Sequence, residues 1–161
     1  NWNTTLVGTT GAGGRGVFAL DVSSPGTFSA TSRLWEINDL TGTDTVKANI
    51  GHVLGKPVIV PVRSLDGTVG WKAIFGNGYS SASGKAVLFV VDIAANASPT
   101  IRMIEATEAG STISGSNGLG NIVVLDRVDS SNIDATTRRP VKVRDGYADW
   151  LDVVPQPAPA P

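Results

Sequence analysis

Short apolar segments recur along the chain, and polar or glycine-rich turns separate them. The segments are rich in valine, isoleucine and aromatic residues, and none keeps a helical period for long. Short runs of this composition, bounded by turn residues, predict β-strands. We expect strands at residues 4–10, 16–22, 33–37, 56–62, 71–76, 86–93, 100–106, 121–128 and 149–154. A helical turn is expected only within residues 42–55, so the pattern predicts an all-β fold.

Residues 11–16 read GAGGRG, which fits the G-x-G-x-x-G spelling of a dinucleotide-binding turn. Such a turn needs a helix directly after it, because amide groups at the helix N-terminus face the phosphates. Here the next residues read VFALDV, a β-rich run without a capping residue. The pattern therefore favours a glycine-rich hairpin loop between two antiparallel strands, and no nucleotide is expected.

Two pairs of segments resemble each other within the chain. Residues 4–24 and 72–95 both contain a strand, a glycine, a polar loop, a basic residue and a strand ending in apolar-Asp-apolar. Residues 55–71 and 120–150 both contain a strand followed by Asp-Gly-x-x-x-Trp. Together these repeats predict units of four short antiparallel strands, which is typical of a β-propeller blade.

The repeats also predict the domain organisation. We expect a partial or open β-propeller over residues 1–154, with blades at about 1–38, 55–107 and 119–154. Residues 155–161 alternate proline with other residues and are expected to form an extended tail or linker. Because a blade buries its faces only against neighbouring blades, we expect the chain to be one arc of a longer polypeptide.

Composition narrows the possible functions. The 13 basic and 14 acidic residues give a formal net charge of −1 without a basic stripe, so nucleic acid is not expected as a partner. The apolar runs are much shorter than the roughly 20 residues of a membrane-spanning helix, so no membrane span is expected. The chain has no cysteine, which removes disulfides and thiolate chemistry from consideration.

The sequence also predicts the roles of the histidine, two aspartates and the tryptophans. His52 is the only histidine and lacks a recognisable nucleophile context, so we expect a surface or loop residue rather than a catalytic base. Asp21 and Asp92 end equivalent strands and are expected to accept hydrogen bonds from turn amides. The tryptophans are expected to pack between blades, with a sugar-stacking platform as the alternative. They are Trp2, Trp35, Trp71 and Trp150.

The order of motifs along the chain resembles a known family. The motifs are GAGGRGVFALDV, RLWEI, GKPVIVPV, WKAIFGNGYSS and GKAVLFVVDI. In this order they resemble the C-terminal β-propeller of PilY1-type proteins, the type IV pilus tip-associated adhesins of Gram-negative bacteria. The resemblance extends over about residues 5–93 and continues loosely to residue 154. It implies export through the periplasm and outer membrane to the cell surface and the pilus tip.

The same family carries a calcium loop, roughly Asp-x-Asp-x-Asp-Gly-x-x-Asp, after a strand that resembles GLGNIVVLD here. Calcium takes six to eight oxygen ligands, which closely spaced aspartates supply. The resemblance implies calcium as cofactor, with Asp126 as the first ligand, Asp145 and Asp149 as the last two, and Asp129 between them. An insertion at residues 127–144 separates these positions. The alternative is therefore a degenerate site, in which Asp145 belongs to a simple turn.

The resemblance leads to one preferred function and two alternatives. The preferred function is a non-enzymatic adhesion and assembly module of a type IV pilus tip protein, modulated by calcium and active in surface attachment, pilus biogenesis and twitching motility. Its implied partners are minor pilins at the tip and host or abiotic surfaces, with the basic residues 138–144 as a contact surface. The first alternative is a fragment of a quinoprotein-like propeller dehydrogenase, which needs a pyrroloquinoline cofactor, calcium and a base. The second is a scaffold without a ligand.

Overall fold

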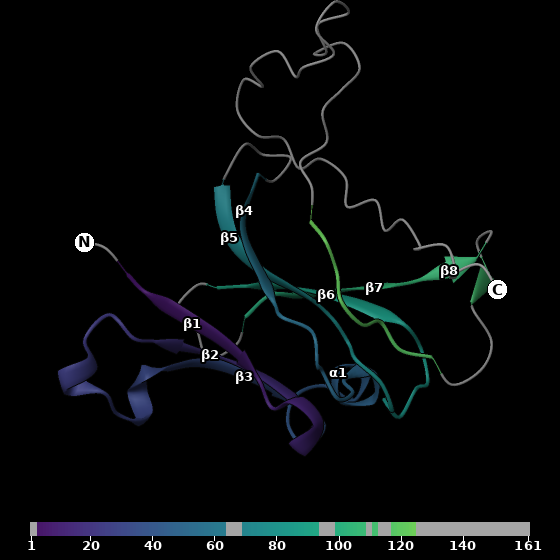
Figure 1. Ribbon diagram of the computed structural model, residues 1–161, viewed down its shortest axis with the longest axis horizontal. Helices are drawn as coiled ribbons and strands as arrows, with labels where there is room; N and C mark the ends of the chain where they lie inside the picture. The colour runs from purple at the N-terminus through teal and green to yellow at the C-terminus, as the bar shows by residue number, and fades with distance from the viewer. Residues whose placement is uncertain (1–2, 64–68, 94–98, 109–110, 113–116, 125–161) are drawn as a thin grey trace, which may run out of the picture.

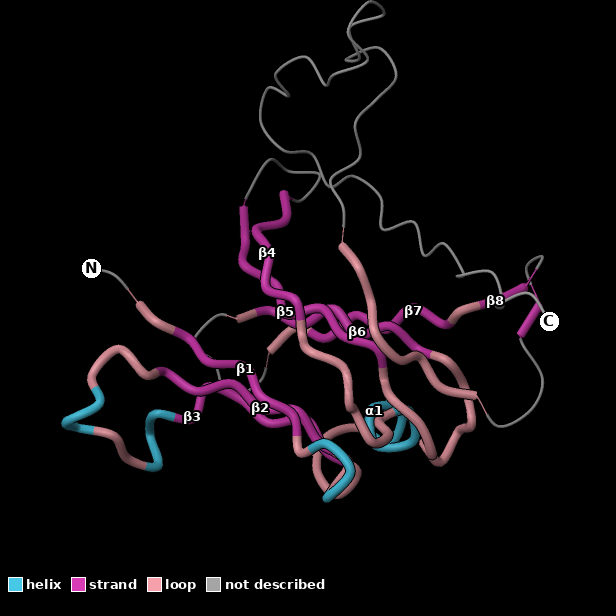
Figure 2. The backbone as a smooth tube through the Cα atoms, in the orientation of Figure 1, coloured by secondary structure: helices cyan, strands magenta, loops and turns pink. Residues whose placement is uncertain are grey.

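The computed structural model describes residues 3–63, 69–93, 99–108, 111–112 and 117–124 (Figure 1). Strands account for most of its regular structure, and Figure 2 shows them in magenta. The strands are β1 (Thr5–Thr9), β2 (Gly16–Asp21), β3 (Arg33–Asn38), β4 (Val58–Arg63), β5 (Val69–Gly76), β6 (Val87–Asp92), β7 (Ile101–Glu105), β8 (Thr107–Glu108) and β9 (Ser111–Thr112). The helical segments are one short α-helix, α1 (Asp44–Asn49), and the 3-10 turns η1 (Gly11–Gly13), η2 (Pro25–Thr27) and η3 (Ala30–Ser32).

The strands form two main antiparallel sheets in which each strand lies beside its neighbour in the sequence. The first sheet has the order β1-β2-β3 and the second has the order β4-β5-β6-β7, while β8 and β9 form a separate small pair. The all-β class and the antiparallel blades predicted from the sequence are confirmed. The helical turn expected within residues 42–55 is also confirmed, because α1 lies there.

The glycine-rich segment GAGGRG forms the turn of the β1–β2 hairpin. The backbone amide of Thr10 donates a hydrogen bond of 3.0 Å to the carbonyl of Gly16, and Val17 lies opposite Thr9 in the ladder. Gly11 has a φ of 61°, a left-handed conformation that favours glycine. A strand rather than a helix follows Gly16, so the predicted hairpin is confirmed.

The two sheets and α1 bury a common core. Apolar side chains line up on the facing sides of the sheets because alternate residues of a strand share a face. Phe75 of β5 and Phe89 of β6 stack inside it, with ring centroids 5.3 Å apart and an interplanar angle of 4°. The buried members of the core are Val17, Ala19, Trp35, Ile37, Val46, Ile50, Val53, Ala73, Phe75, Val87, Phe89 and Val91. Neither sheet alone would shield these side chains, so the pair folds as a stacked unit.

The helix α1 closes one end of this core. Its first turn is capped by the side chain of Thr43, which accepts a hydrogen bond of 3.4 Å from the backbone amide of Val46. Asp44 and Lys47 form an ion pair of 2.8 Å on the outer side, and hydrogen bonding to Lys47 lowers the pKa of Asp44. Val46 is buried, so the helix presents one apolar residue to the core and charged residues to solvent.

The two tryptophans within the described residues differ in burial. Trp35 of β3 is only 1% exposed, which confirms its predicted packing between the sheets. Trp71 of β5 is 59% exposed, so the same prediction is wrong for it. Along the same face of β5, burial begins only at Ala73 and continues to Phe75, two and four residues beyond Trp71. Trp2 and Trp150 lie outside the described residues.

The two aspartates at the strand ends also differ. Asp21 accepts a hydrogen bond of 2.9 Å from the backbone amide of Ser23, as predicted. Asp92 forms an ion pair with Lys72, which lies directly opposite it in the β5–β6 ladder. The turn after Asp92 includes residues 94–98, which lie outside the described residues, so its bond to a turn amide stays a prediction. Opposite charges on facing strands stabilise the β5–β6 pair.

Candidate functional site

Asn77 lies just after β5 and is completely buried. Its side-chain Nδ2 donates hydrogen bonds of 2.8 Å to the backbone carbonyls of Asn49 and Lys85. Its Oδ1 accepts hydrogen bonds from the backbone amides of Val87, at 3.1 Å, and Leu119, at 2.9 Å. All the hydrogen-bonding positions of the amide are therefore occupied. The side chain joins the end of α1, the β5–β6 loop and the segment at Leu119.

Glycines surround Asn77 because backbones approach one another closely there. Gly78 has a φ of 73°, and a Cβ at this position would overlap the backbone of His52. A Cβ on Gly76 would overlap the carbonyl of Leu119 in the same way. The motif IFGNGY thus combines a core phenylalanine, two glycines that permit close approach and one amide that satisfies buried backbone groups.

A hollow of about 190 Å³ lies beside Asn77. The rings of His52 and Tyr79 stack in its wall with centroids 5.1 Å apart, and the backbones of the two residues pair through an isolated antiparallel bridge. The lining residues are His52, Leu54, Gly78, Tyr79, Gly118 and Gly120. Apart from the imidazole of His52, the described side chains that line the hollow are aromatic or apolar. The expectation of a loop histidine is confirmed.

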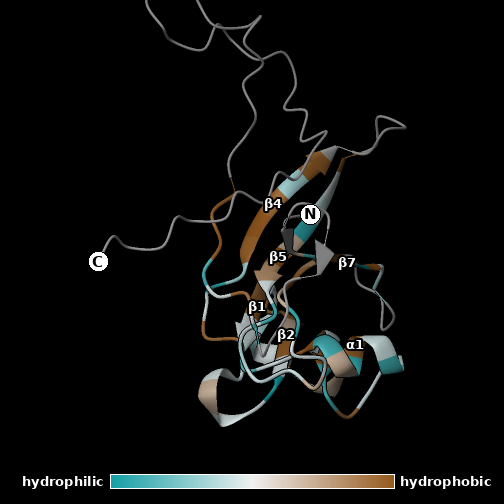
Figure 3. Cartoon of the chain, turned by 90° about the vertical axis from the view of Figure 1, so that its right-hand side faces the viewer, coloured by the Kyte–Doolittle hydropathy of each residue, from teal (hydrophilic) through white to brown (hydrophobic). Residues whose placement is uncertain are grey.

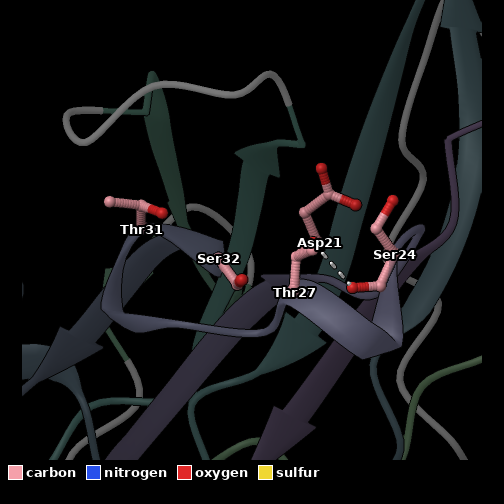
Figure 4. A pocket seen from close by; sticks show the side chains of 5 residues that line it. All are labelled: Asp21, Ser24, Thr27, Thr31 and Ser32. Carbon is pink, nitrogen blue, oxygen red and sulfur yellow. Dashed lines mark hydrogen bonds between the residues drawn. The ribbon is translucent and has the colours of Figure 1, made fainter.

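A second hollow, of about 270 Å³, lies in the loop between β2 and β3 (Figure 4). It is lined by Asp21, Ser24, Thr27, Thr31 and Ser32. Thr27 donates its hydroxyl to the carbonyl of Ser24 at 3.2 Å, which is the dashed line in Figure 4. Hydrogen bonds from the side chain and backbone of Ser23 lower the pKa of Asp21. These hydroxyls serve turns within the loop, and the hollow is a polar surface feature.

The sequence-predicted calcium ligands Asp126, Asp129, Asp145 and Asp149 all lie outside the described residues. Within the described ranges, no group of three or more histidine, aspartate and glutamate side chains comes together to hold a metal ion. The structure does place the segment 117–124, which precedes Asp126 in the chain. Its Leu119 carbonyl accepts a hydrogen bond of 2.8 Å from the amide of Gly78, in addition to the bond from Leu119 to Asn77. The calcium site stays a prediction.

The junction around Asn77 was not expected from the sequence. The signal that would have suggested it is the asparagine between two glycines, directly after an apolar strand. That pattern is also typical of an exposed turn, which is the more common interpretation. In the part of the chain that the structure describes, no helix has the length and apolar character needed to cross a membrane.

Comparison with known proteins identifies the family. The family described as the PilY1 beta-propeller domain matches residues 1–146, which is most of the chain. The chain belongs to the PilY1 β-propeller family. The relatives of this family include a type IV pilus biogenesis factor PilY1 homolog of Xylella fastidiosa, which is 46% identical over 140 residues. That alignment covers 83% of this chain and 9% of the relative.

Two further PilY1 proteins come from Pseudomonas aeruginosa. A type IV pilus biogenesis factor PilY1 is 39% identical over 92 residues, which cover 57% of this chain and 7% of the relative. The crystal structure of the PilY1 C-terminal domain matches with a TM-score of 0.56 and 34% identity, over 74% of this chain and 21% of that one. The chain therefore spans less than a tenth of the length of these curated PilY1 relatives. Its sheets are blades of the PilY1 propeller.

Proposed function

We propose that this chain is the part of a type IV pilus tip protein that supplies adhesion and assembly surfaces, and that it has no catalytic activity of its own. The observation that carries the proposal is the match to the PilY1 family over residues 1–146. The relatives in that family are named type IV pilus biogenesis factors, which supports a pilus-associated role. On this proposal the chain lies at the cell surface after export through the periplasm and outer membrane.

The proposed mechanism is the presentation of loops on a rigid stack of sheets. The shared core fixes the sheets relative to each other, and the loops that leave them expose Phe28, Leu40 and Leu54 to solvent. Binding residues concentrate on loops that a rigid scaffold positions. These loops are the proposed contacts to minor pilins and to host or abiotic surfaces, together with the basic residues 138–144.

We further propose that Asp126, Asp129, Asp145 and Asp149 bind calcium and that calcium modulates adhesion. Four carboxylates supply the oxygen ligands that calcium prefers. The preceding segment 117–124 is hydrogen-bonded to Asn77 and Gly78, so the proposed loop starts from a fixed point on the second sheet. A fixed start reduces the conformational entropy lost when calcium gathers its ligands.

Surface variants in the parent bacterium test the adhesion proposal. We expect a chromosomal double substitution, Phe28→Ser with Leu40→Ser, to reduce surface attachment and twitching while pilus number stays the same. The matched control is Thr41→Ser. Thr41 is exposed and lies next to Leu40 in the chain, and this substitution leaves the apolar side chains of Phe28 and Leu40 in place. Normal attachment and twitching by the double variant would contradict the proposal. Absorbance of the purified protein for a bound quinone would instead favour the dehydrogenase alternative.

Calorimetric titration tests the metal proposal separately. We expect a measurable heat of calcium binding with the wild-type chain. Asp149→Ala should bind calcium at least about tenfold more weakly, because one carboxylate ligand is lost. Asp39→Ala is a suitable control, since Asp39 lies in the first sheet region and pairs with Arg15. No heat with any of the three proteins would remove calcium from the proposal and leave the adhesion surface untouched.

A further inference from the structure

The hollow of about 190 Å³ beside Asn77 is walled by connecting segments from three distant parts of the chain. Its lining residues fall within the ranges 52–54, 78–79 and 118–120. These ranges lie outside the strands β4 to β7. The hollow is therefore bounded by loops, and not by the face of a sheet or the edge of a strand. We call it the His52–Tyr79 hollow.

Backbone hydrogen bonds fix the walls of the hollow. The amide of His52 donates a hydrogen bond of 2.8 Å to the carbonyl of Tyr79, and the amide of Tyr79 donates one of 3.3 Å in return. The amide of Gly78 donates a hydrogen bond of 2.8 Å to the carbonyl of Leu119. Ser80 has a φ of 58°, which is uncommon for a residue with a side chain. Backbone of this kind persists where the surrounding structure imposes it, and it clusters at ligand sites.

The hollow exposes apolar surface in a region of mainly polar loops. Leu54 is 63% exposed and Tyr79 is 46% exposed, although both line a concave surface. Figure 3 shows that the loops around α1 are mostly pale or teal, with short brown stretches. Within the described residues the Tyr79 hydroxyl forms no hydrogen bond, so it remains available as a donor. The hollow therefore suits an uncharged, apolar ligand that carries hydrogen-bond acceptors.

The chain itself contains a segment of this chemistry, outside the described residues. After Val124 the charged residues recur up to Asp152, and residues 153–161 read VVPQPAPAP without a charge. Alternating prolines favour the polyproline II conformation, whose backbone carbonyls have no internal hydrogen bonds. Proline also lacks an N–H group, so the segment offers acceptors and apolar rings but few donors. Aromatic-lined grooves bind proline-rich segments in this conformation.

The length of chain between the hollow and this segment allows the two to meet. Gly118 and Gly120, in the wall of the hollow, come shortly before Val124. Residues 125–154 span at most about 100 Å when extended, which is ample for a return to the hollow. A ligand joined to its site by a linker binds with an effective concentration on the order of millimolar. A shallow hollow that holds a free peptide weakly is therefore filled by a segment of the same chain.

We propose that residues 153–161 of this chain bind in the His52–Tyr79 hollow as a polyproline II segment. This conformation has three residues per turn, so Pro155 and Pro161, which are two turns apart, share a face. That face packs on Tyr79 and Leu54, and the Tyr79 hydroxyl donates a hydrogen bond to a carbonyl of the segment. The segment then covers exposed apolar side chains of the loops, so a partner that binds there must displace it. This contact within the chain goes beyond the proposed adhesion function.

A nitroxide label near the end of the segment tests this inference by NMR. The chain has no cysteine, so Ala160→Cys gives the isotope-labelled 161-residue protein a single site for the label. His52 is the only histidine, so its imidazole signals are unambiguous. We expect the label to broaden these signals and the amide signals of Gly78 and Gly118. The amides of the β2–β3 loop, at the other end of the first sheet, should stay sharp (Figure 1).

Variants of the hollow, made in the labelled chain, show whether the segment binds inside it. A Cβ on Gly120 would meet no atom within 4 Å, so Gly120→Leu adds an apolar side chain at the wall without overlapping the backbone. We expect this variant to lose the broadening at His52. Leu54→Ser acts on the exposed rim, so it tests the same contact if Gly120→Leu folds poorly. The matched control Leu40→Ser, at an 82% exposed leucine that does not line the hollow, should keep the broadening.

Three outcomes would overturn the inference. The first is sharp His52 signals in the labelled chain, which would show that the segment lies elsewhere. The second is broadening that persists in both Gly120→Leu and Leu54→Ser, because the segment would then lie near the hollow without entering it. The third is equal broadening in isotope-labelled chains that carry no nitroxide and are mixed with labelled ones, which would place the segment of a second copy there. These spectra need no attachment or twitching, so their failure would leave the adhesion proposal standing.

Discussion

The turn of the first hairpin and the turn of the second have similar sequences but different surroundings. In the first, a Cβ added to Gly11 or Gly13 would meet no atom within 4 Å, so this turn is open to solvent. In the second, Gly76 and Gly78 touch other backbones and Asn77 between them is buried. Glycine allows an unusual backbone angle in the first turn, whereas in the second it also makes room for a neighbouring segment. A repeated pattern therefore does not imply a repeated environment.

The two hairpins also differ in register. Asp21 lies opposite Thr5 and Gly8 lies opposite Phe18 in the first hairpin. In the second, Asp92 lies opposite Lys72. Along the sequence, the separation between Lys72 and Gly76 is one residue longer than the separation between Thr5 and Gly8. A shift of one residue reverses the face on which a side chain lies. Asp92 has the cation Lys72 directly opposite it, whereas Asp21 faces Thr5, so an ion pair forms across the second hairpin only.

The comparison of the two sheets can be tested most strongly at the tryptophans. We expect Trp35→Ala to lower the free energy of unfolding by about 3–5 kcal/mol, because it leaves a cavity in the common core. Trp71→Ala is the matched control and should cost less than about 1 kcal/mol, since the side chain is already largely exposed. Urea unfolding followed by circular dichroism measures both. Equal losses would show that the two sheets are covered alike.

The buried amide in the second turn provides the next test. Asn77→Ala removes hydrogen bonds from two backbone amides and two carbonyls, so we expect a loss of about 2–4 kcal/mol in the free energy of unfolding. Asn3→Ala, at an exposed position, should change it by less than about 0.5 kcal/mol. A loss below 1 kcal/mol for Asn77→Ala would mean that the segment at Leu119 is held by other contacts.

Glycine substitutions sharpen the contrast between the turns. Gly78→Ala combines a φ of 73° with overlap against the backbone of His52, so a loss of about 1–3 kcal/mol in the free energy of unfolding is expected. Gly13→Ala should be close to neutral, because its Cβ would point into open space. Thermal unfolding of both variants measures the difference. A neutral Gly78→Ala would contradict the close approach seen here.

The smallest effect concerns pH. Hydrogen bonds from Ser23 lower the pKa of Asp21, so the ionised carboxylate favours the folded state at neutral pH. That contribution is present above the ordinary aspartate pKa and is lost as the pH falls through the lower pKa of the folded chain. We expect NMR titration to show the pKa of Asp21 rising toward its ordinary value in Ser23→Ala. The pKa of Asp44, which Lys47 lowers, should stay the same.

Local pattern was enough to predict the strands β1 to β7, the helical turn and the hairpin at GAGGRG. Each depends on residues that are near neighbours in the sequence, and a strand or a tight turn has a short-range signal. The expected strand at 121–128 shows the limit of such signals, because its described residues 121–124 have no strand pairing. The calcium ligands, from Asp126 to Asp149, lie outside the described residues and remain predictions of the family resemblance.

The sequence by itself determined which segments extend, where they turn and to which family the chain belongs, since these follow from local composition and motif order. Only the tertiary structure decided the role of Asn77, whose side-chain partners lie 8 to 42 residues away along the chain. It also decided that Trp35 is buried and Trp71 exposed, although both are strand tryptophans. The burial of a strand residue depends on which element packs against that face of the sheet. The neighbouring residues in the sequence do not reveal this, because the packing element comes from a distant part of the chain.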